Sequence, residues 1–148
     1  MEKSFNTYLQ YSRHITKLIN TRIATVSNKY KLTKLDAHAL IFFSVDEHDP
    51  TASEFCKCGV YPKSNVSKSL LDLSNKGLVT MQPQKEDRRY QDVILTEKGK
   101  KIAEEIRKEI NPIISKLSYG IDKEEKKIMF SAMHKLKNNI DILMKELD

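Results

Sequence analysis

The stretch that decides the fold is 61–96, which reads YPKSNVSKSLLDLSNKGLVTMQPQKEDRRYQDVILT. Its first part has apolar residues at helical spacing, namely Val66, Leu70 and Leu73. Gly77 ends this helix, because glycine readily adopts the left-handed conformation found at helix C-termini. Residues 78–81 and 92–95 have the composition of β-strands, and the charged loop between them has no apolar pattern. The stretch therefore predicts a short helix followed by a two-stranded hairpin.

Two further helical patterns precede this stretch. Thr33 and Asp36 have the spacing of a capping box, and the residues after them are apolar on most sides, so this helix should lie in the centre of the domain. Thr51 or Ser53 can cap a short third helix. Pro62 suits the first turn of the helix that follows. Two helices joined by a tight turn and followed by a hairpin predict a winged helix-turn-helix, in a mainly α fold with a small β-hairpin wing.

Long helices are predicted on both sides of this unit. Residues 5–26 repeat apolar side chains at three- and four-residue steps, and a similar pattern follows Thr96, which can cap a helix. Pro112 falls inside that second pattern and should kink or loosen the helix. Asp122 and Glu125 have the spacing of a capping box at the start of the last helix. Within that helix the spacing from Leu136 onward is that of a short coiled-coil seam. These helices carry more apolar surface than one subunit needs, so we expect two copies of the chain to pair.

The composition narrows the possible functions. At 148 residues the chain has the size of one domain, and 39% hydrophobic residues are enough for a single core. The net charge of +6 favours a polyanionic partner without identifying it. The N-terminus lacks the apolar segment of a signal peptide, and no apolar run reaches membrane-spanning length. We therefore expect a cytoplasmic protein that contacts no membrane and keeps Cys56 and Cys58 reduced.

The helix that starts near Pro62 carries residues suited to DNA. Small polar and basic side chains lie away from its apolar stripe: Lys63, Ser64, Asn65, Ser67 and Lys68. Such side chains read base edges in the major groove. Asn65 is the best candidate for base reading, because an Asn side chain can form two hydrogen bonds with adenine. Lys63 should bind a phosphate, whereas Ser64 and Lys68 could read bases or hold phosphates.

The charged loop of the hairpin supplies a second set of candidate DNA contacts, which are Lys85, Asp87, Arg88 and Arg89. The two arginines could enter a narrow minor groove, where the negative potential is enhanced. Asp87 can orient the guanidinium of Arg89 through a forked salt bridge. The alternative is a polar hairpin tip that stays solvated and binds nothing, but the helix-turn-helix before it favours DNA binding.

In order and spacing, these pieces resemble the MarR family of winged helix-turn-helix transcriptional regulators. The matching segments are 32–33, 53–55, 64–68, 73–79, 87–89 and 95–99. The chain departs from the family pattern at Gly59-Val60, where Leu-Gly is usual, and at Pro62, where Ser or Thr is usual. The family's frequent Gln in the second helix is Asp36 here, which also serves as a cap residue.

The resemblance implies an obligate homodimer in which each subunit offers one winged helix to a pseudo-palindromic operator. The two recognition helices would then lie about one DNA turn apart, roughly 34–36 Å. It also implies one MarR-like domain over 1–148, with 1–30 and 100–148 as the helical dimerisation region and 31–99 as the winged helix-turn-helix. Many members bind small organic acids between these two regions. The side chains here that suit an organic anion, or alternatively serve the dimer interface, are Tyr8, Tyr11, Arg13, His14 and Arg22.

Cysteine and histidine positions offer weaker hypotheses. Cys56 and Cys58 are two residues apart on a helix and point to different faces, so they cannot easily form a disulfide or chelate together. We expect Cys56 to be a buried small hydrophobe and Cys58 to be exposed and oxidisable, without a basic cluster to activate its thiolate. His38 and His48 could hold a metal together with acidic residues of 46–49, but a solvated helix end is the favoured alternative. No metal ion or other cofactor is therefore expected.

The sequence thus predicts a sequence-specific DNA-binding transcriptional regulator, a homodimeric repressor of a double-stranded operator that a small organic anion modulates. The alternatives are a redox-responsive regulator that uses Cys58 and a winged-helix module that binds protein instead of DNA. An enzyme is not expected, because the sequence has no Gly-rich phosphate loop, no Ser/His/Asp or Cys/His arrangement and no paired acids in a plausible cleft.

Overall fold

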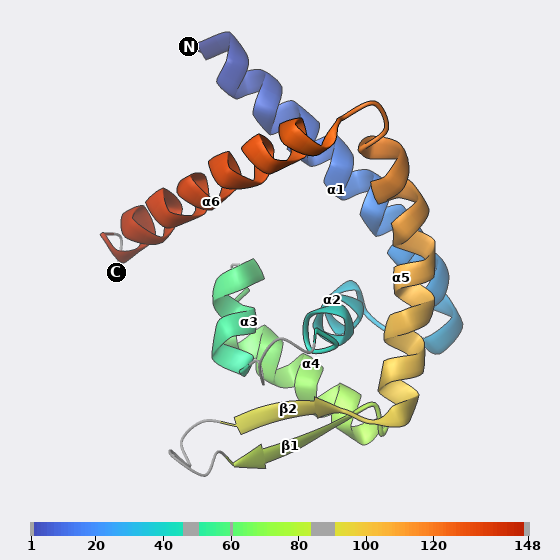
Figure 1. The fold of residues 1–148 in the computed structure, drawn as a ribbon. Coiled ribbons are helices and arrows are strands. Elements are labelled where there is room, and N and C mark those ends of the chain that lie inside the picture. Colours follow the sequence, from blue (N-terminus) through green and yellow to red (C-terminus); the bar gives the residue numbers. More distant parts are fainter. Residues whose placement is uncertain (1, 46–50, 60, 84–90, 147–148) are drawn as a thin grey trace. The chain divides into compact units, whose positions relative to one another are not determined.

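The computed structural model describes residues 2–45, 51–59, 61–83 and 91–146. The elements, in chain order, are α1 (Glu2–Tyr30), α2 (Lys34–Phe42), α3 (Ala52–Gly59), α4 (Lys63–Asn75), β1 (Val79–Pro83), β2 (Gln91–Leu95), α5 (Glu97–Leu117) and α6 (Lys123–Lys145) (Figure 1). The chain divides into two compact units, Met1–Ile113 and Ile114–Asp148. The first unit contains the helices and the hairpin of the winged helix-turn-helix, so the predicted mainly α fold with a small β-hairpin wing is confirmed.

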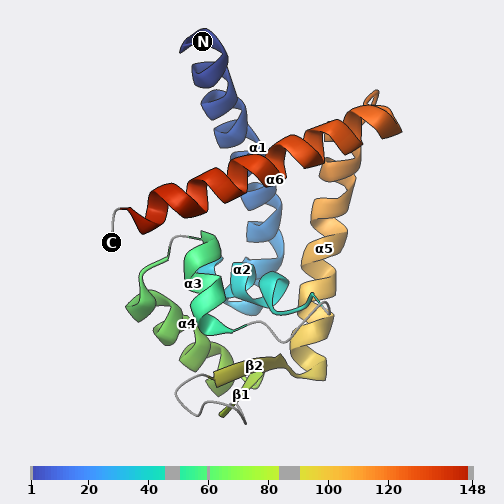
Figure 2. The same ribbon diagram turned by 60° about the vertical axis from the view of Figure 1, so that its left-hand side comes forward.

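The core of the first unit surrounds α2, as its apolar sequence predicts. Ala37, Ala39 and Leu40 are completely buried in this helix, which packs against α1 and α4 (Figure 2). Every other element of the unit contributes to the same core, with members that include Ile23, Val26, Phe55, Val66, Leu70, Leu73, Val79, Val93, Leu95, Ile102 and Ile106. The apolar stripe of α4 is therefore fixed in the core, and only its other faces are available to a partner.

Short-range hydrogen bonds fix where the helices of the core begin. At the start of α2, the Thr33 hydroxyl accepts from the Asp36 amide at 3.1 Å, and the Asp36 carboxylate accepts from the Thr33 amide at 2.8 Å. Thr51 and Glu54 exchange the same two bonds at the start of α3. The cap of the third helix is therefore Thr51 and not Ser53, the other residue that the sequence allowed.

Pro62 and Gly77 determine where α4 begins and ends. Pro62 lies just before the first helical residue, and not in the first turn as predicted, and its carbonyl accepts from amides of that turn. Gly77 has a φ of +66°, the left-handed conformation expected after a helix. The next amide, that of Leu78, turns back to donate to the Leu73 carbonyl at 2.9 Å. This closing bond stops α4 and directs the chain into the hairpin.

The hairpin is antiparallel, with Val79 opposite Leu95 and Pro83 opposite Gln91. The observed strands differ from the predicted segments 78–81 and 92–95 by one or two residues at their ends.

A tight junction joins the hairpin to α5. Thr96 donates from its amide to the Leu78 carbonyl at 3.0 Å and from its hydroxyl to the Gly77 carbonyl at 2.8 Å. The same hydroxyl accepts from the Gly99 amide, so Thr96 caps α5 as predicted. A Cβ atom on Gly99 would lie only 2.1 Å from the Leu78 carbonyl oxygen, so only glycine fits this position.

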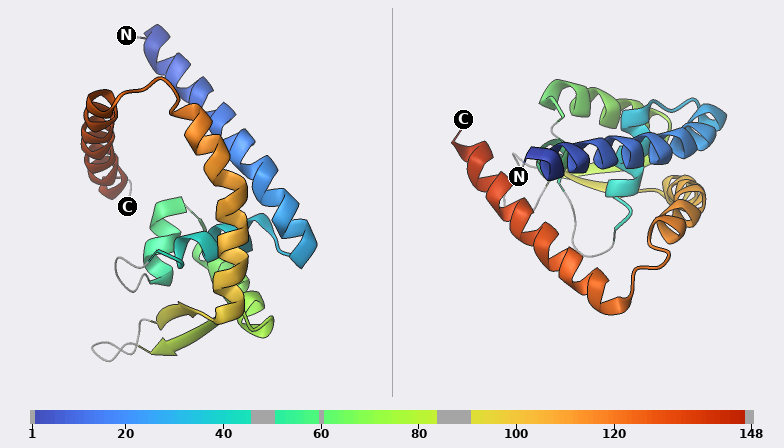
Figure 3. Two further views of the ribbon diagram at one scale, coloured as in Figure 1. Left: turned by 45° about the vertical axis from the view of Figure 1, so that its right-hand side comes forward. Right: turned by 90° about the horizontal axis from the view of Figure 1, so that it is seen from above.

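The end of α1 is linked to the middle of α5. Lys29 and Tyr30 both donate to the carboxylate of Glu105, at 2.8 and 2.7 Å. The ribbon of this part of α5 accordingly runs beside the end of α1 (Figure 3). Helix α1 continues to Tyr30, a few residues past its apolar pattern. Helix α5 continues through Pro112 to Leu117, so this proline does not end the helix.

The second unit consists of the end of α5 and α6. Asp122 and Glu125 form the predicted capping box at the start of α6. No residue of this 23-residue helix is buried. Large apolar side chains are exposed along it, and they include Ile128, Phe130, Met133, Leu136, Ile140 and Leu143. Among the helices that the structure describes, none has the length and apolar character needed to cross a membrane.

Candidate nucleic-acid interface

Helix α4 separates its core-facing residues from its polar residues. Val66, Ser69, Leu70 and Leu73 are buried. All five residues predicted to contact DNA in this helix are exposed, and they are Lys63, Ser64, Asn65, Ser67 and Lys68. The helix begins without a side-chain cap, and residues 62–65 at its start are exposed, so the positive end of its dipole also faces outward. The structure thus brings polar and basic groups together on the N-terminal half of α4.

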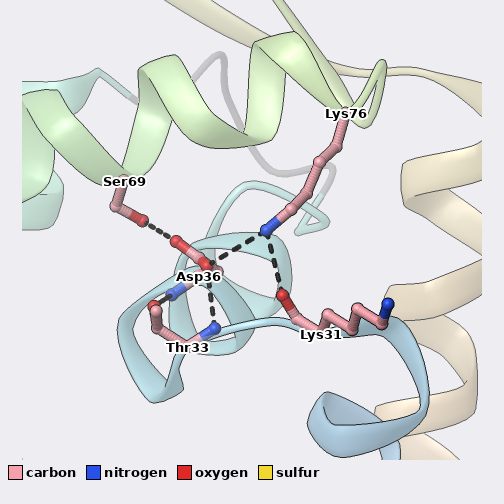
Figure 4. Close-up of polar contacts among 5 residues, drawn as sticks. All are labelled: Lys31, Thr33, Asp36, Ser69 and Lys76. Atoms are coloured by element: carbon pink, nitrogen blue, oxygen red, sulfur yellow. Dashed lines mark hydrogen bonds and ion pairs between the residues drawn. The ribbon is translucent and has the colours of Figure 1, made fainter.

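A buried carboxylate holds α4 against α2 (Figure 4). Asp36 is only 1% exposed, and besides capping α2 it accepts a hydrogen bond from the hydroxyl of Ser69 in the middle of α4. Lys76, just after α4, lies 3.9 Å from the same carboxylate and donates to the Lys31 carbonyl at 3.0 Å. We call Asp36, Ser69 and Lys76 the Asp36 network. From the sequence Asp36 was expected to be only a cap residue, and the bond to Ser69 spans 33 positions that no local pattern connects.

A second polar cluster lies at the turn that leads into α4. The His38 ring accepts from the Tyr61 hydroxyl at Nδ1, at 2.6 Å, and donates from Nε2 to the Asn20 amide oxygen at 3.1 Å. This assignment follows because the amide oxygen can only accept. Burial lowers the pKa of His38, and Lys34 lowers it further. Burial also raises the pKa of Tyr61. With His38 and Tyr61 both uncharged, the cluster joins α1, α2 and the α3–α4 turn. The sequence did not indicate this role.

The predicted wing contacts lie outside the described residues. Lys85, Asp87, Arg88 and Arg89 belong to 84–90, between the two strands. The described part of the hairpin extends to the pair formed by Pro83 and Gln91. The role of these four residues in DNA binding therefore stays a prediction.

The residues predicted to bind an organic anion are all exposed on α1: Tyr8, Tyr11, Arg13, His14 and Arg22. An open hollow on this helix is lined by Arg13, Thr16, Lys17, Asn20, Thr21 and Ala24. Of the five predicted residues, only Arg13 lines this hollow. Their joint role as an anion site stays a prediction.

The cysteine and histidine hypotheses meet different outcomes. Cys56 is half-buried and packs against the core, so it is less enclosed than predicted. Cys58 is exposed, as predicted. His38 is bound to Tyr61 and Asn20, and its proposed metal partners at 46–49 lie outside the described residues. Among the residues that the structure describes, no group of three or more His, Cys, Asp or Glu side chains could hold a metal ion.

Comparisons with known proteins agree with this geometry. The family model of the winged helix DNA-binding domain matches residues 32–99. A MarR-family transcriptional regulator from Silicibacter pomeroyi is 20% identical, with a TM-score of 0.79 over 93% of this chain and 91% of that one. MepR from S. aureus, in its DNA-binding conformation, is 19% identical, with a TM-score of 0.79 over 90% of this chain and 98% of its own.

A MarR-family regulator from Listeria monocytogenes, in complex with a 26mer DNA, is 17% identical. It superposes with a TM-score of 0.75 over 89% of this chain and 87% of its own. At these identities the solved structures establish the fold, and the family model locates the domain within it. Residues 32–99 therefore match the model of a winged helix DNA-binding domain, and the chain has the fold of the MarR-family transcriptional regulators.

Proposed function

We propose that this protein is a sequence-specific DNA-binding transcriptional regulator, a homodimer that represses by occupying a pseudo-palindromic operator. The observation that carries the proposal is the division of α4 into two faces. Its apolar stripe is buried in the core, while its small polar and basic side chains are exposed. A helix fixed in this way presents the chemistry that the major groove accepts. Relatives of the same fold that are bound to DNA support the proposal.

Within α4 the proposal gives separate roles to exposed residues. Asn65 reads adenine, because an amide side chain matches the donor and acceptor that adenine shows in the major groove. Lys63 and Lys68 neutralise phosphates and fix the helix in register. Arg88 and Arg89, in the wing, enter the neighbouring minor groove.

The dimer is the second part of the proposal. Support comes from the apolar side chains that α6 leaves exposed and from Ile15 and Leu18, which α1 leaves exposed. We assign 1–30 and 100–148 to dimerisation and 31–99 to DNA binding. An organic anion held by the exposed aromatic and cationic residues of α1 would change the distance between the two recognition helices and so modulate DNA binding.

Selection of bound fragments from genomic DNA, followed by gel-shift titration at several salt concentrations, tests the proposal. If Lys63, Lys68, Arg88 and Arg89 of both subunits each neutralise one phosphate, the slope of log affinity against log salt is about −7. Failure to bind any fragment at low salt would contradict the proposal and favour a protein-interaction module. An Arg89→Ala variant with parental affinity would contradict the wing assignment alone.

Base reading by Asn65 is tested separately. Asn65→Ala should flatten the base preference and leave weak nonspecific binding, because phosphate contacts remain. Asn28→Ala, an exposed amide near the end of α1, is the matched control and should bind as the parent does. If Asn65→Ala keeps the parental base preference, Asn65 does not contact bases.

A further inference from the structure

Helix α4 carries a large apolar side chain that its packing does not use. Leu71 is 54% exposed, although Leu70 and Leu73 on either side are buried. It follows Ser64 by seven residues and Lys68 by three, and the α-helix makes a full turn every 3.6 residues. Leu71 therefore lies on the same outward face as Ser64 and Lys68. In the sequence Leu71 adjoins the apolar stripe and so does not stand out as a contact residue.

Single exposed leucines are common on protein surfaces and need no explanation by themselves. This one differs in its surroundings, since the exposed residues one helical turn away from it on α4 are polar or basic, namely Ser67, Lys68 and Asn75. Leu71 is also absent from the core cluster and from the partly buried side chains packed against that cluster. A docking face for another protein would need several adjoining apolar side chains, whereas a lone one beside cations matches a polyanion that displays a small apolar group.

We propose that Leu71 is a specificity-determining residue that packs against the 5-methyl group of a thymine in the major groove. This inference rests on the proposed DNA-binding function and deepens it. The thymine methyl is the apolar group that the major groove displays, and it distinguishes a T·A pair from the others. Lys63 and Lys68 supply the positive charge that would hold the same face of α4 against phosphates.

The helix geometry also limits where that thymine lies. Seven residues at a rise of 1.5 Å each separate Leu71 from Ser64 by roughly 10 Å along the helix axis. Neighbouring base pairs are about 3.4 Å apart. The thymine should therefore lie no more than about three base pairs from the pair contacted by Ser64, in each operator half-site.

The test is a thymine-to-deoxyuridine scan of an operator selected with the parent protein. Each substitution removes one methyl group and leaves every hydrogen-bonding group of the base in place. Loss of one buried methyl is worth about a fourfold change in affinity. We expect about that loss for the parent protein at one thymine per half-site, and no loss at that position for Leu71→Ala. Val45→Ala, which truncates another exposed apolar side chain, should keep the parental pattern.

The outcomes separate this inference from the proposed function. The parent protein can bind the operator and yet show, at every thymine, the same change in affinity as Leu71→Ala. That result would overturn the role of Leu71 and leave DNA binding in place. If the parent protein selects no fragment at all, both are overturned. Equal thermal unfolding of the two proteins, expected because Leu71 is exposed, verifies that the comparison reports on binding and not on folding.

Discussion

At the scale of single residues, His38 is the group whose protonation the fold opposes. Its ring accepts from Tyr61 and donates to Asn20, which requires the neutral form, and burial lowers its pKa from the ordinary value of 6.5. In the unfolded chain the same ring has its ordinary pKa of 6.5 and binds a proton near that pH. Below it the unfolded state binds more protons than the folded state, so acid favours unfolding.

We therefore predict that the stabilising contribution of a neutral His38 is complete above pH 6.5 and is lost as the pH falls below that value. His38→Gln should be less stable than the parent at pH 7.5 and should show a smaller loss between pH 7.5 and 5.5. Urea unfolding at several pH values measures both effects. His134→Gln, at an exposed position of α6, is the matched control, and an unchanged pH dependence in His38→Gln would refute the prediction.

At the scale of elements, the position of α4 against α2 depends on the Asp36 network. Asp36→Ala removes one of the two bonds of the α2 capping box, the one that the carboxylate accepts from the Thr33 amide, and leaves the buried hydroxyl of Ser69 without its acceptor. Loss of that capping bond costs about 1 kcal/mol, and loss of a hydrogen bond to a charged group about 1.5–3 kcal/mol. We expect the free energy of unfolding to fall by about 2–4 kcal/mol in a denaturant titration.

Lys76 provides the comparison for that prediction. It is partly exposed and 3.9 Å from the carboxylate, so Lys76→Ala should cost less than about 1 kcal/mol. Equal losses for the two variants would mean that Asp36 acts mainly through the ion pair and not through its cap and its bond to Ser69.

The elements also show what the sequence can predict. Local patterns predicted the capping boxes at Thr33 and Asp122, the left-handed Gly77 and the paired strands, because each depends on residues a few positions apart. The exposed polar face of α4 was predictable for the same reason. The bonds from Asp36 to Ser69 and from His38 to Tyr61 were not, since they depend on how helices pack. Leu71 was not predicted as a contact residue because the expected DNA contacts on this helix were its polar and basic side chains.

At the scale of the whole molecule, α6 is a long helix in which no residue is buried within one chain. We predict that Leu136→Glu raises the dimer dissociation constant by about 100-fold or more, because an unpaired carboxylate in an apolar interface costs several kcal/mol. Sedimentation velocity measures the change, and operator affinity should fall with it. Asn138→Asp, at an exposed position of the same helix, is the control for one added negative charge. A Leu136→Glu protein that sediments as the parent does would place the interface elsewhere.

The junction between the hairpin and α5 has a consequence for changes in chain length. Thr96 and Gly99 fit against the carbonyls of Gly77 and Leu78 only at their present spacing. Each residue of an α-helix advances the chain by about 100° around its axis. One residue inserted or deleted between Thr96 and Gly99 would swing the glycine away from that contact and bring a side chain into its place. The number of residues in this junction is therefore as tightly constrained as the identity of its glycine.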